Sequence, residues 1–193
     1  MDHPLRAYEL DDASVQLLAH PLRLRLLALL RADGPSTASR LADRVDESSG
    51  VTSYHLRKLA EAGFIEEDPS RGTKRDRWWR SAHEATHVSH AEFLGNPDAH
   101  RASVSVRREM NRWKQRLVDQ WLAEETDWDK AWVDAAGAND WLLRLTPAQT
   151  KALNEEILDV VRRYNDDEAP EDDPGAERVI WFQHLIPVRE LPF

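Results

Sequence analysis

Residues 36–63 constrain the fold of this chain more than any other stretch. Their sequence, STASRLADRVDESSGVTSYHLRKLAEAG, contains two short amphipathic segments separated by a polar turn, DES, which is the pattern of a helix-turn-helix. The first segment begins at Ser36 and Thr37, whose hydroxyls suit the cap of a helix N-terminus. Its apolar side chains share one helical face: Leu41, Ala42 and Val45.

The second segment has the features of a helix that reads DNA. Thr52, Leu56 and Leu59 recur at helical spacing and predict a buried stripe, and Gly63 supplies a residue that can end the helix. The opposite face carries hydroxyls, one aromatic ring and two cations, which are the groups that reach phosphates and base edges in a major groove. These outward residues are Ser49, Val51, Ser53, Tyr54, Arg57 and Lys58. Because many paired helices only pack, this segment alone does not decide the function.

A β-hairpin with a basic tip is predicted directly after the second helix. A short strand at 64–67 and a second strand at 75–80 are separated by a turn that contains Pro69, Ser70 and Gly72. The tip carries three cations: Arg71, Lys74 and Arg75. A basic hairpin in this position is a wing that can touch the DNA backbone beside the groove. The order of elements therefore predicts a winged helix-turn-helix.

The charge of the chain is unevenly distributed. The formal net charge is −9, but residues 1–82 hold 13 basic and 13 acidic residues, whereas residues 83–193 hold 13 and 22. Residues 49–82 hold 7 basic and 5 acidic residues, and Glu66, Glu67 and Asp68 lie together in the first strand of the wing. We therefore expect binding that depends on groove contacts and on a dimer, because each subunit can neutralise few phosphates.

The segment before the helix-turn-helix is divided by a proline. Pro21 suits the first turn of a helix, so we expect a short helix up to Ala19 and a longer one from Pro21. His20 is read as a helix-start or packing residue. Leu22, Leu26, Leu29 and Leu30 are predicted to face the core, with Arg23, Arg25 and Arg31 outside.

These motifs together resemble the winged-helix domain of ArsR-like bacterial transcriptional regulators. The resemblance is carried by AHPLRLRLLALL, LADR, SSGVTSYHLRKLAEAGFIEE and RGTKRDRWWR, in that order, over residues 10–81. It implies a DNA-binding homodimer, usually a repressor, with its recognition helix at 49–62. Ser49, Val51, Ser53, Tyr54 and Arg57 match the groove-facing positions, and the wing tip matches 71–75. The side to which His55 faces stays open.

Metal sensing is an alternative within the same resemblance. The chain has no cysteine, which excludes the thiolate sites of metal-sensing relatives. His83, His87 and His90 have the spacing of one helical face, with His100 beyond them, and three imidazoles on one face could hold Zn or Ni. If residues 83–97 form an irregular linker instead, the spacing has no meaning. We name no metal ligand and no cofactor.

The longest predicted helix covers residues 98–125. Its apolar stripe recurs at three- and four-residue steps: Val106, Met110, Trp113, Leu117 and Trp121. Two tryptophans on one long helix indicate a partner helix, and we expect dimerisation there. The alternative is packing against the C-terminal part of the same chain.

Residues 126–193 are predicted to form a small α+β domain. Alternating apolar residues at 131–145 indicate a hairpin around Gly137, and Thr146, Pro147 and Gln149 predict a capped helix to about Tyr164. An acidic loop and an apolar strand at 178–188 follow. The aromatic residues either line an effector pocket or form the core: Trp128, Trp132, Trp141, Trp181 and Phe182.

The sequence as a whole predicts a mainly α protein with α+β elements. We expect a winged helix-turn-helix domain at 10–82, a linker at 83–97, a dimerisation helix at 98–125 and the C-terminal domain at 126–193. The predicted function is a sequence-specific regulator that binds an inverted-repeat operator as a homodimer, with a small-molecule effector left open. The alternatives are the metal-responsive version and a winged helix that contacts proteins.

Other classes of protein are not expected from this sequence. It contains no nucleophile-base grouping and no Gly-rich phosphate loop, so we do not expect an enzyme. It contains no apolar run of the roughly 20 residues that span a bilayer and no signal-peptide core, so we expect a cytoplasmic protein without a membrane partner.

Overall fold

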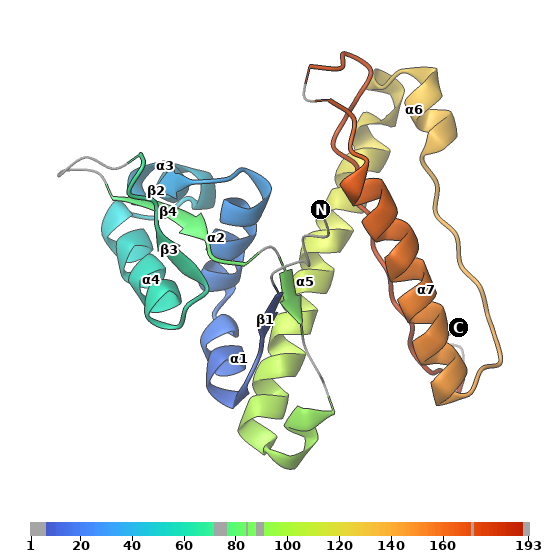
Figure 1. Cartoon of the computed structure of the whole chain (residues 1–193), viewed down its shortest axis with the longest axis horizontal. Coiled ribbons are helices and arrows are strands. Elements are labelled where there is room, and N and C mark those ends of the chain that lie inside the picture. Colours follow the sequence, from blue (N-terminus) through green and yellow to red (C-terminus); the bar gives the residue numbers. More distant parts are fainter. Residues whose placement is uncertain (1–6, 72–76, 84, 88–90, 171, 191–193) are drawn as a thin grey trace. The chain divides into compact units, whose positions relative to one another are not determined.

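The computed structural model describes residues 7–71, 77–83, 85–87, 91–170 and 172–190. The chain divides into two units, Met1–Asp119 and Gln120–Phe193, and each is described by itself (Figure 1). The wing-tip residues Lys74 and Arg75, and His90, lie outside the described residues.

Four helices form the first part of unit 1, and local capping signals set their starts. Helix α1 (Asp12–Leu18) begins with a capping box between Asp11 and Ser14, and α2 (Pro21–Ala32) has its proline in the first turn. Helix α3 (Ala38–Val45) is capped by Thr37, and α4 (Ser49–Glu61) is capped by Ser48. The predicted break at Pro21 and the two helices of the helix-turn-helix are therefore confirmed. His20 is the N-cap of α2, as expected for a helix-start residue.

The predicted wing is an antiparallel pair, β3 (Ile65–Glu67) and β4 (Trp78–Ser81), with Glu66 opposite Arg80. A third strand, β2 (Ser36–Thr37), pairs with the other edge of β4, so the sheet order is β2-β4-β3. A second sheet was not predicted: β1 (Ala7–Glu9) runs parallel to β5 (Ala85–His87).

One hydrophobic core holds unit 1 together. Leu26, Leu56, Leu59 and Phe64 have no exposed surface, so α2, α4 and the start of the wing pack on one another. Leu29 is only partly buried against this core. The predicted outward positions of Arg23 and Arg31 are wrong, because both side chains are half-buried. The Arg31 guanidinium donates to the carbonyls of His83 and Ala85, whereas Arg23 Nε is buried with no hydrogen-bond partner among the described residues.

The long helix α5 (Pro97–Glu124) has the predicted extent to within one residue. A 3-10 turn, η1 (Glu92–Gly95), precedes it, and η2 (Glu125–Asp127) follows it. Its first turns carry Ala99, Ala102 and Val106 into the core of unit 1. The predicted linker at 83–97 thus contains strand β5 and η1.

Helices are the regular elements in the described residues of unit 2, which also include long stretches without regular structure at 136–146 and 172–190. Helix α7 (Pro147–Asp166) starts with the predicted capping box between Thr146 and Gln149. The predicted hairpin at 131–145 is wrong, because residues 130–135 form a short helix, α6 (Lys130–Ala135), closed by Ala136 N–H donating to the Trp132 carbonyl at 2.8 Å. The predicted strand at 178–188 is also wrong, because these residues form neither a strand nor a helix. A strand needs a neighbour to pair with, and the described residues of unit 2 contain no strand.

None of the helices among the described residues is, by itself, long and apolar enough to cross a bilayer; the bent pair α1 and α2 meets the criterion only when taken together, by length and composition.

Candidate nucleic-acid interface

Helix α4 is fixed in place at both ends and along its inner face. The turn before it contains Asp46 in the left-handed conformation, φ 57°, and the Glu47 N–H donates to the Ala42 carbonyl at 3.1 Å. The Ser48 hydroxyl accepts from the Val51 N–H at 3.3 Å, and Gly63, φ 77°, follows the helix. Left-handed backbone favours glycine and tolerates aspartate, which explains both residue choices. The predicted inner stripe is confirmed, since Thr52, Leu56 and Leu59 are fully buried.

The opposite face of α4 presents most of the predicted DNA-contacting side chains to solvent. Ser49, Val51, Tyr54 and Arg57 are exposed, while Ser53 and Lys58 are half-buried. Tyr54 is 50% exposed although it is a large aromatic residue. A face of hydroxyls, one aromatic ring and a cation can hydrogen-bond to base edges and phosphates.

His55 lies on the inner side of α4. The sequence had left open whether it faces the core or the groove. It is 8% exposed, and its ring centroid lies 4.4 Å from that of His20 and 5.2 Å from that of Tyr54. Burial lowers the pKa of His55, and the neighbouring His20 and Arg23 lower it further. Partial burial and the charge of Arg23 also lower the pKa of His20. The lowered pKa values favour the neutral imidazoles of His20 and His55, which lie in contact at the inner side of α4.

The cations of this face differ in their partners. The Lys58 ammonium pairs with Glu61 at 2.6 Å, which raises the pKa of Lys58. Arg57 forms no ion pair with any other described residue. Its guanidinium is therefore available to a ligand without displacing a carboxylate.

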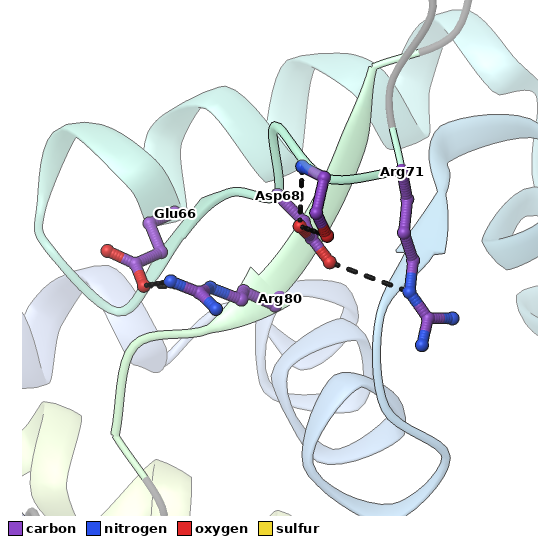
Figure 2. A network of polar contacts seen from close by, with 5 residues as sticks. Glu66, Asp68, Arg71 and Arg80 are labelled. Atoms are coloured by element: carbon purple, nitrogen blue, oxygen red, sulfur yellow. Dashed lines mark hydrogen bonds and ion pairs between the residues drawn. The ribbon is translucent and has the colours of Figure 1, made fainter.

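The base of the wing is organised by acidic side chains (Figure 2). Asp68 accepts from the Ser70 hydroxyl at 2.6 Å and from the Ser70 N–H at 3.0 Å, and these bonds lower the pKa of Asp68. Arg71, the described cation of the predicted wing tip, lies 3.7 Å from Asp68 and packs over the Trp78 ring at 5.8 Å. Arg71 is thus already engaged within the wing.

Two arginines at the second strand of the wing, β4, were not singled out from the sequence. Arg80 pairs with Glu66 at 2.8 Å, and Arg77 pairs with Glu67 at 3.1 Å. The acids of the first strand and the bases of the second were a signal for these pairs, because directly and diagonally opposite side chains of antiparallel strands interact; Glu66 lies opposite Arg80, whereas Glu67 lies opposite Trp79. Predicting these ion pairs required the pairing register of β3 and β4, which the sequence alone does not provide.

A groove of about 330 Å³ runs between α4 and the wing. Arg57 lines it from α4 and Arg77 from the wing, and Trp79 contributes to it. The groove therefore joins the exposed face of the recognition helix to the hairpin, which is the side on which a winged helix contacts a duplex.

The alternative in which the histidines share one helical face is wrong at His87, which lies in strand β5. His83 precedes β5 and lies outside any helix. His100 lies separately, on α5. Over the described ranges, no group of three or more His, Asp or Glu side chains is arranged to hold a metal ion.

The apolar stripe of α5 divides into two parts. Val106 is buried in the core of unit 1, so it is not available to a partner. Met110 and Trp113 are each 40% exposed, and Leu117 and Trp121 are half-buried. The Trp121 ring lies 5.8 Å from that of Trp128.

The C-terminal aromatic residues do not converge as a set. Trp128 and Trp132 lie 6.5 Å apart in an edge-to-face arrangement, whereas Trp141 is 82% exposed and Trp181 is about half exposed. The exposure of Trp141 means that the predicted aromatic residues are not all enclosed together, in a pocket or in a core.

Comparison with known proteins agrees with this geometry. Residues 18–68 match the model of a helix-turn-helix domain family, described as "Helix-turn-helix domain". These residues span α2, α3, α4 and β3. No curated protein matches the chain.

Two solved structures resemble the chain in part. A ZitR variant from Lactococcus lactis in its apo form is 13% identical over 76% of this chain and 83% of its own, with a TM-score of 0.34. A protein described as a possible transcriptional regulator for arsenical resistance is 27% identical over 57% of this chain and 96% of its own, with a TM-score of 0.32. Residues 18–68 of this chain thus match a helix-turn-helix domain family, and in the structure the helix-turn-helix of α3 and α4 is followed by the hairpin of β3 and β4.

Proposed function

We propose that this protein is a repressor that binds an inverted-repeat operator as a homodimer. The observation that carries the proposal is the exposed face of α4, where Ser49, Val51, Tyr54 and Arg57 face solvent around a fully buried inner stripe. A helix held in this way can enter a major groove and hydrogen-bond to base edges. Ser53 and Lys58 lie at the margins of the same face.

The homodimer is supported by the exposed part of the α5 stripe. Met110 and Trp113 leave 40% of their surfaces in water on a long helix, and large apolar side chains exposed in a row mark association surfaces. A two-fold axis through this stripe gives a self-complementary interface. It also supplies the second recognition helix that an inverted repeat requires.

The modest positive charge of the interface supports the same proposal. The chain carries a net charge of −9, and four of the cations near α4 and the wing are paired with acids: Lys58, Arg71, Arg77 and Arg80. One domain therefore gains little from phosphate neutralisation. Two domains on one duplex double the number of contacts without a change in either domain.

The experiment combines a mass measurement with duplex binding. Light scattering of the full chain is expected to give twice the 22.2 kDa of one copy. Met110→Glu places a charge in the α5 stripe and is expected to yield monomers with reduced affinity for duplex DNA. Asn111→Glu adds the same charge at the exposed neighbouring position and is expected to leave the dimer intact. A monomeric wild-type protein would overturn the proposed dimer.

A further inference from the structure

The groove between α4 and the wing is lined by carboxylates as well as by cations. Glu61, Glu66 and Glu67 line it together with Arg57 and Arg77. A DNA backbone that passes along this groove meets three acids and two cations. Such a balance is unusual for a surface that approaches phosphate, because basic side chains normally supply non-specific affinity.

The hairpin register holds two of these acids against the wing cations. Glu66 lies opposite Arg80 in the ladder, and its Oε1 accepts from Arg80 Nε at 2.9 Å and lies 2.8 Å from Nη2 (Figure 2). Glu67 Oε1 lies 3.1 Å from Arg77 Nε. All four side chains are about half exposed.

Fold stability does not require these pairs. Ion pairs between exposed side chains contribute little to stability, because water screens them and ordering the side chains opposes them. Buried Ile65 and Trp79 already anchor the two strands to the core of unit 1. The pairs are therefore free to open when a phosphate competes with the carboxylate for the guanidinium.

We propose that Glu66 and Glu67 set the selectivity of DNA binding by neutralising the wing cations and repelling the backbone. This inference rests on the proposed function and deepens it. A random duplex lacks the base contacts that match α4, so its binding depends on its phosphates, and Arg77 and Arg80 are already paired with carboxylates. An operator also offers base contacts to the exposed face of α4, and these do not depend on the wing carboxylates.

The test is the variant Glu66→Gln/Glu67→Gln in the full chain. The probe is a pool of random-sequence duplexes, titrated between about 50 mM and 200 mM salt. Freeing two cations is expected to steepen the slope of log affinity against log salt by about 2 and to raise pool affinity about 10-fold at low salt. The control Glu155→Gln/Asp159→Asn removes two paired acids from α7, and it is expected to leave the slope unchanged.

A double-mutant cycle identifies the cations that act. Arg77→Gln/Arg80→Gln leaves Glu66 and Glu67 unpaired, so it is expected to lower the pool affinity in the wild-type background and to abolish the gain in the Glu66→Gln/Glu67→Gln background. Unchanged pool affinity and slope in the Glu variant would overturn the inference, as would a gain that persists without the arginines. If circular dichroism shows that the double Glu variant is unfolded, Glu67→Gln with Arg77→Gln repeats the cycle at one pair.

Selectivity is read from a duplex chosen from the pool by wild-type protein. In the Glu66→Gln/Glu67→Gln variant, affinity for this selected duplex is expected to rise less than affinity for the random pool. The ratio of selected-duplex affinity to pool affinity therefore falls. An equal rise would mean that the carboxylates tune affinity alone, and would overturn the inference. If wild type binds no duplex, the proposed function fails; if wild type binds and the variant matches it, only this inference fails.

Discussion

His20 and His55 lie with their ring centroids 4.4 Å apart, which joins the start of α2 to the inner side of the recognition helix. His20 Nδ1 accepts from the Leu22 N–H at 3.2 Å, while His55 Nδ1 is buried without a hydrogen-bond partner among the described residues. Arg23, Glu47 and Tyr54 are the other charged or titratable groups that influence this pair. The start of α2 and the inner side of α4 are thus in contact through two imidazoles whose pKa values are both lowered.

Stability is expected to fall in mild acid because of this pair. Burial lowers the pKa of folded His55 below that of a free histidine, about 6.5. The unfolded chain then binds more protons, so the contribution to stability is complete above about pH 6.5 and is lost as the pH falls from there towards the folded pKa. Thermal unfolding midpoints between neutral and mildly acidic pH measure this loss.

A matched pair of variants identifies the group responsible. His55→Gln is expected to flatten the pH dependence, whereas His100→Gln, on α5, is expected to retain it. An identical slope in wild type and in His55→Gln would contradict the assignment.

Leu56→Ala is expected to destabilise the protein by about 2–5 kcal/mol, because it leaves a cavity in a fully buried site. Val51→Ala, on the exposed face of the same helix, is expected to change stability by less than about 0.5 kcal/mol and to lower duplex affinity. Denaturant unfolding measures the first effect, and fluorescence anisotropy with labelled duplex measures the second. Equal losses of stability would mean that α4 is turned differently about its axis.

Arg57→Ala is expected to weaken binding to a selected duplex by about 1–3 kcal/mol if its guanidinium reads a base. Lys58→Ala is expected to weaken it less, because Glu61 lies 2.6 Å from the Lys58 ammonium and already partly neutralises it. Binding titrations of both variants against the selected duplex and the random pool separate base reading from phosphate contact. A larger effect at Lys58 would reverse the assigned roles.

Arg31→Lys is expected to destabilise unit 1 by about 1–3 kcal/mol. The Arg31 guanidinium donates to the His83 carbonyl at 3.1 Å, the Ala85 carbonyl at 3.2 Å and the Thr86 hydroxyl at 2.9 Å, and one ammonium cannot reach all three. Hydrogen exchange is expected to accelerate in β1 and β5 before it does in α4. Arg25→Lys, at an exposed position of the same helix, serves as the control.

Local signals made much of unit 1 predictable. Pro21, Thr37 and Ser48 mark helix starts through their own backbone and side-chain chemistry, and the stripe of Thr52, Leu56 and Leu59 follows from the helical period. The resemblance to ArsR-like domains added the order of helices and wing. The exposed face of α4 followed from the same period, since a buried stripe fixes the outward residues.

Contacts between distant residues were not predictable. Strand β1 pairs with β5 across most of unit 1, with Ala7 beside Ala85, and neither three-residue strand has a pattern of its own. The histidine spacing was compatible with a helix until this pairing placed His87 in a strand. The ion pairs of the wing required the register of β3 and β4.

In unit 2, short apolar alternation was ambiguous. Ala131, Val133 and Ala135 alternate with polar residues and tryptophan, which predicts a strand, yet six residues are also enough for the short helix α6. Thr146 and Gln149, by contrast, specified the start of α7 through a reciprocal pair of hydrogen bonds.

The most direct test of the central claim is selection of duplexes by the purified full chain from a random-sequence pool, followed by sequencing. The account predicts an enriched inverted repeat whose half-sites are centred about 10 base pairs apart, roughly 34 Å along the duplex, or a multiple of that spacing. Recovery of duplexes without a shared sequence, or of none above the level retained without protein, would contradict it.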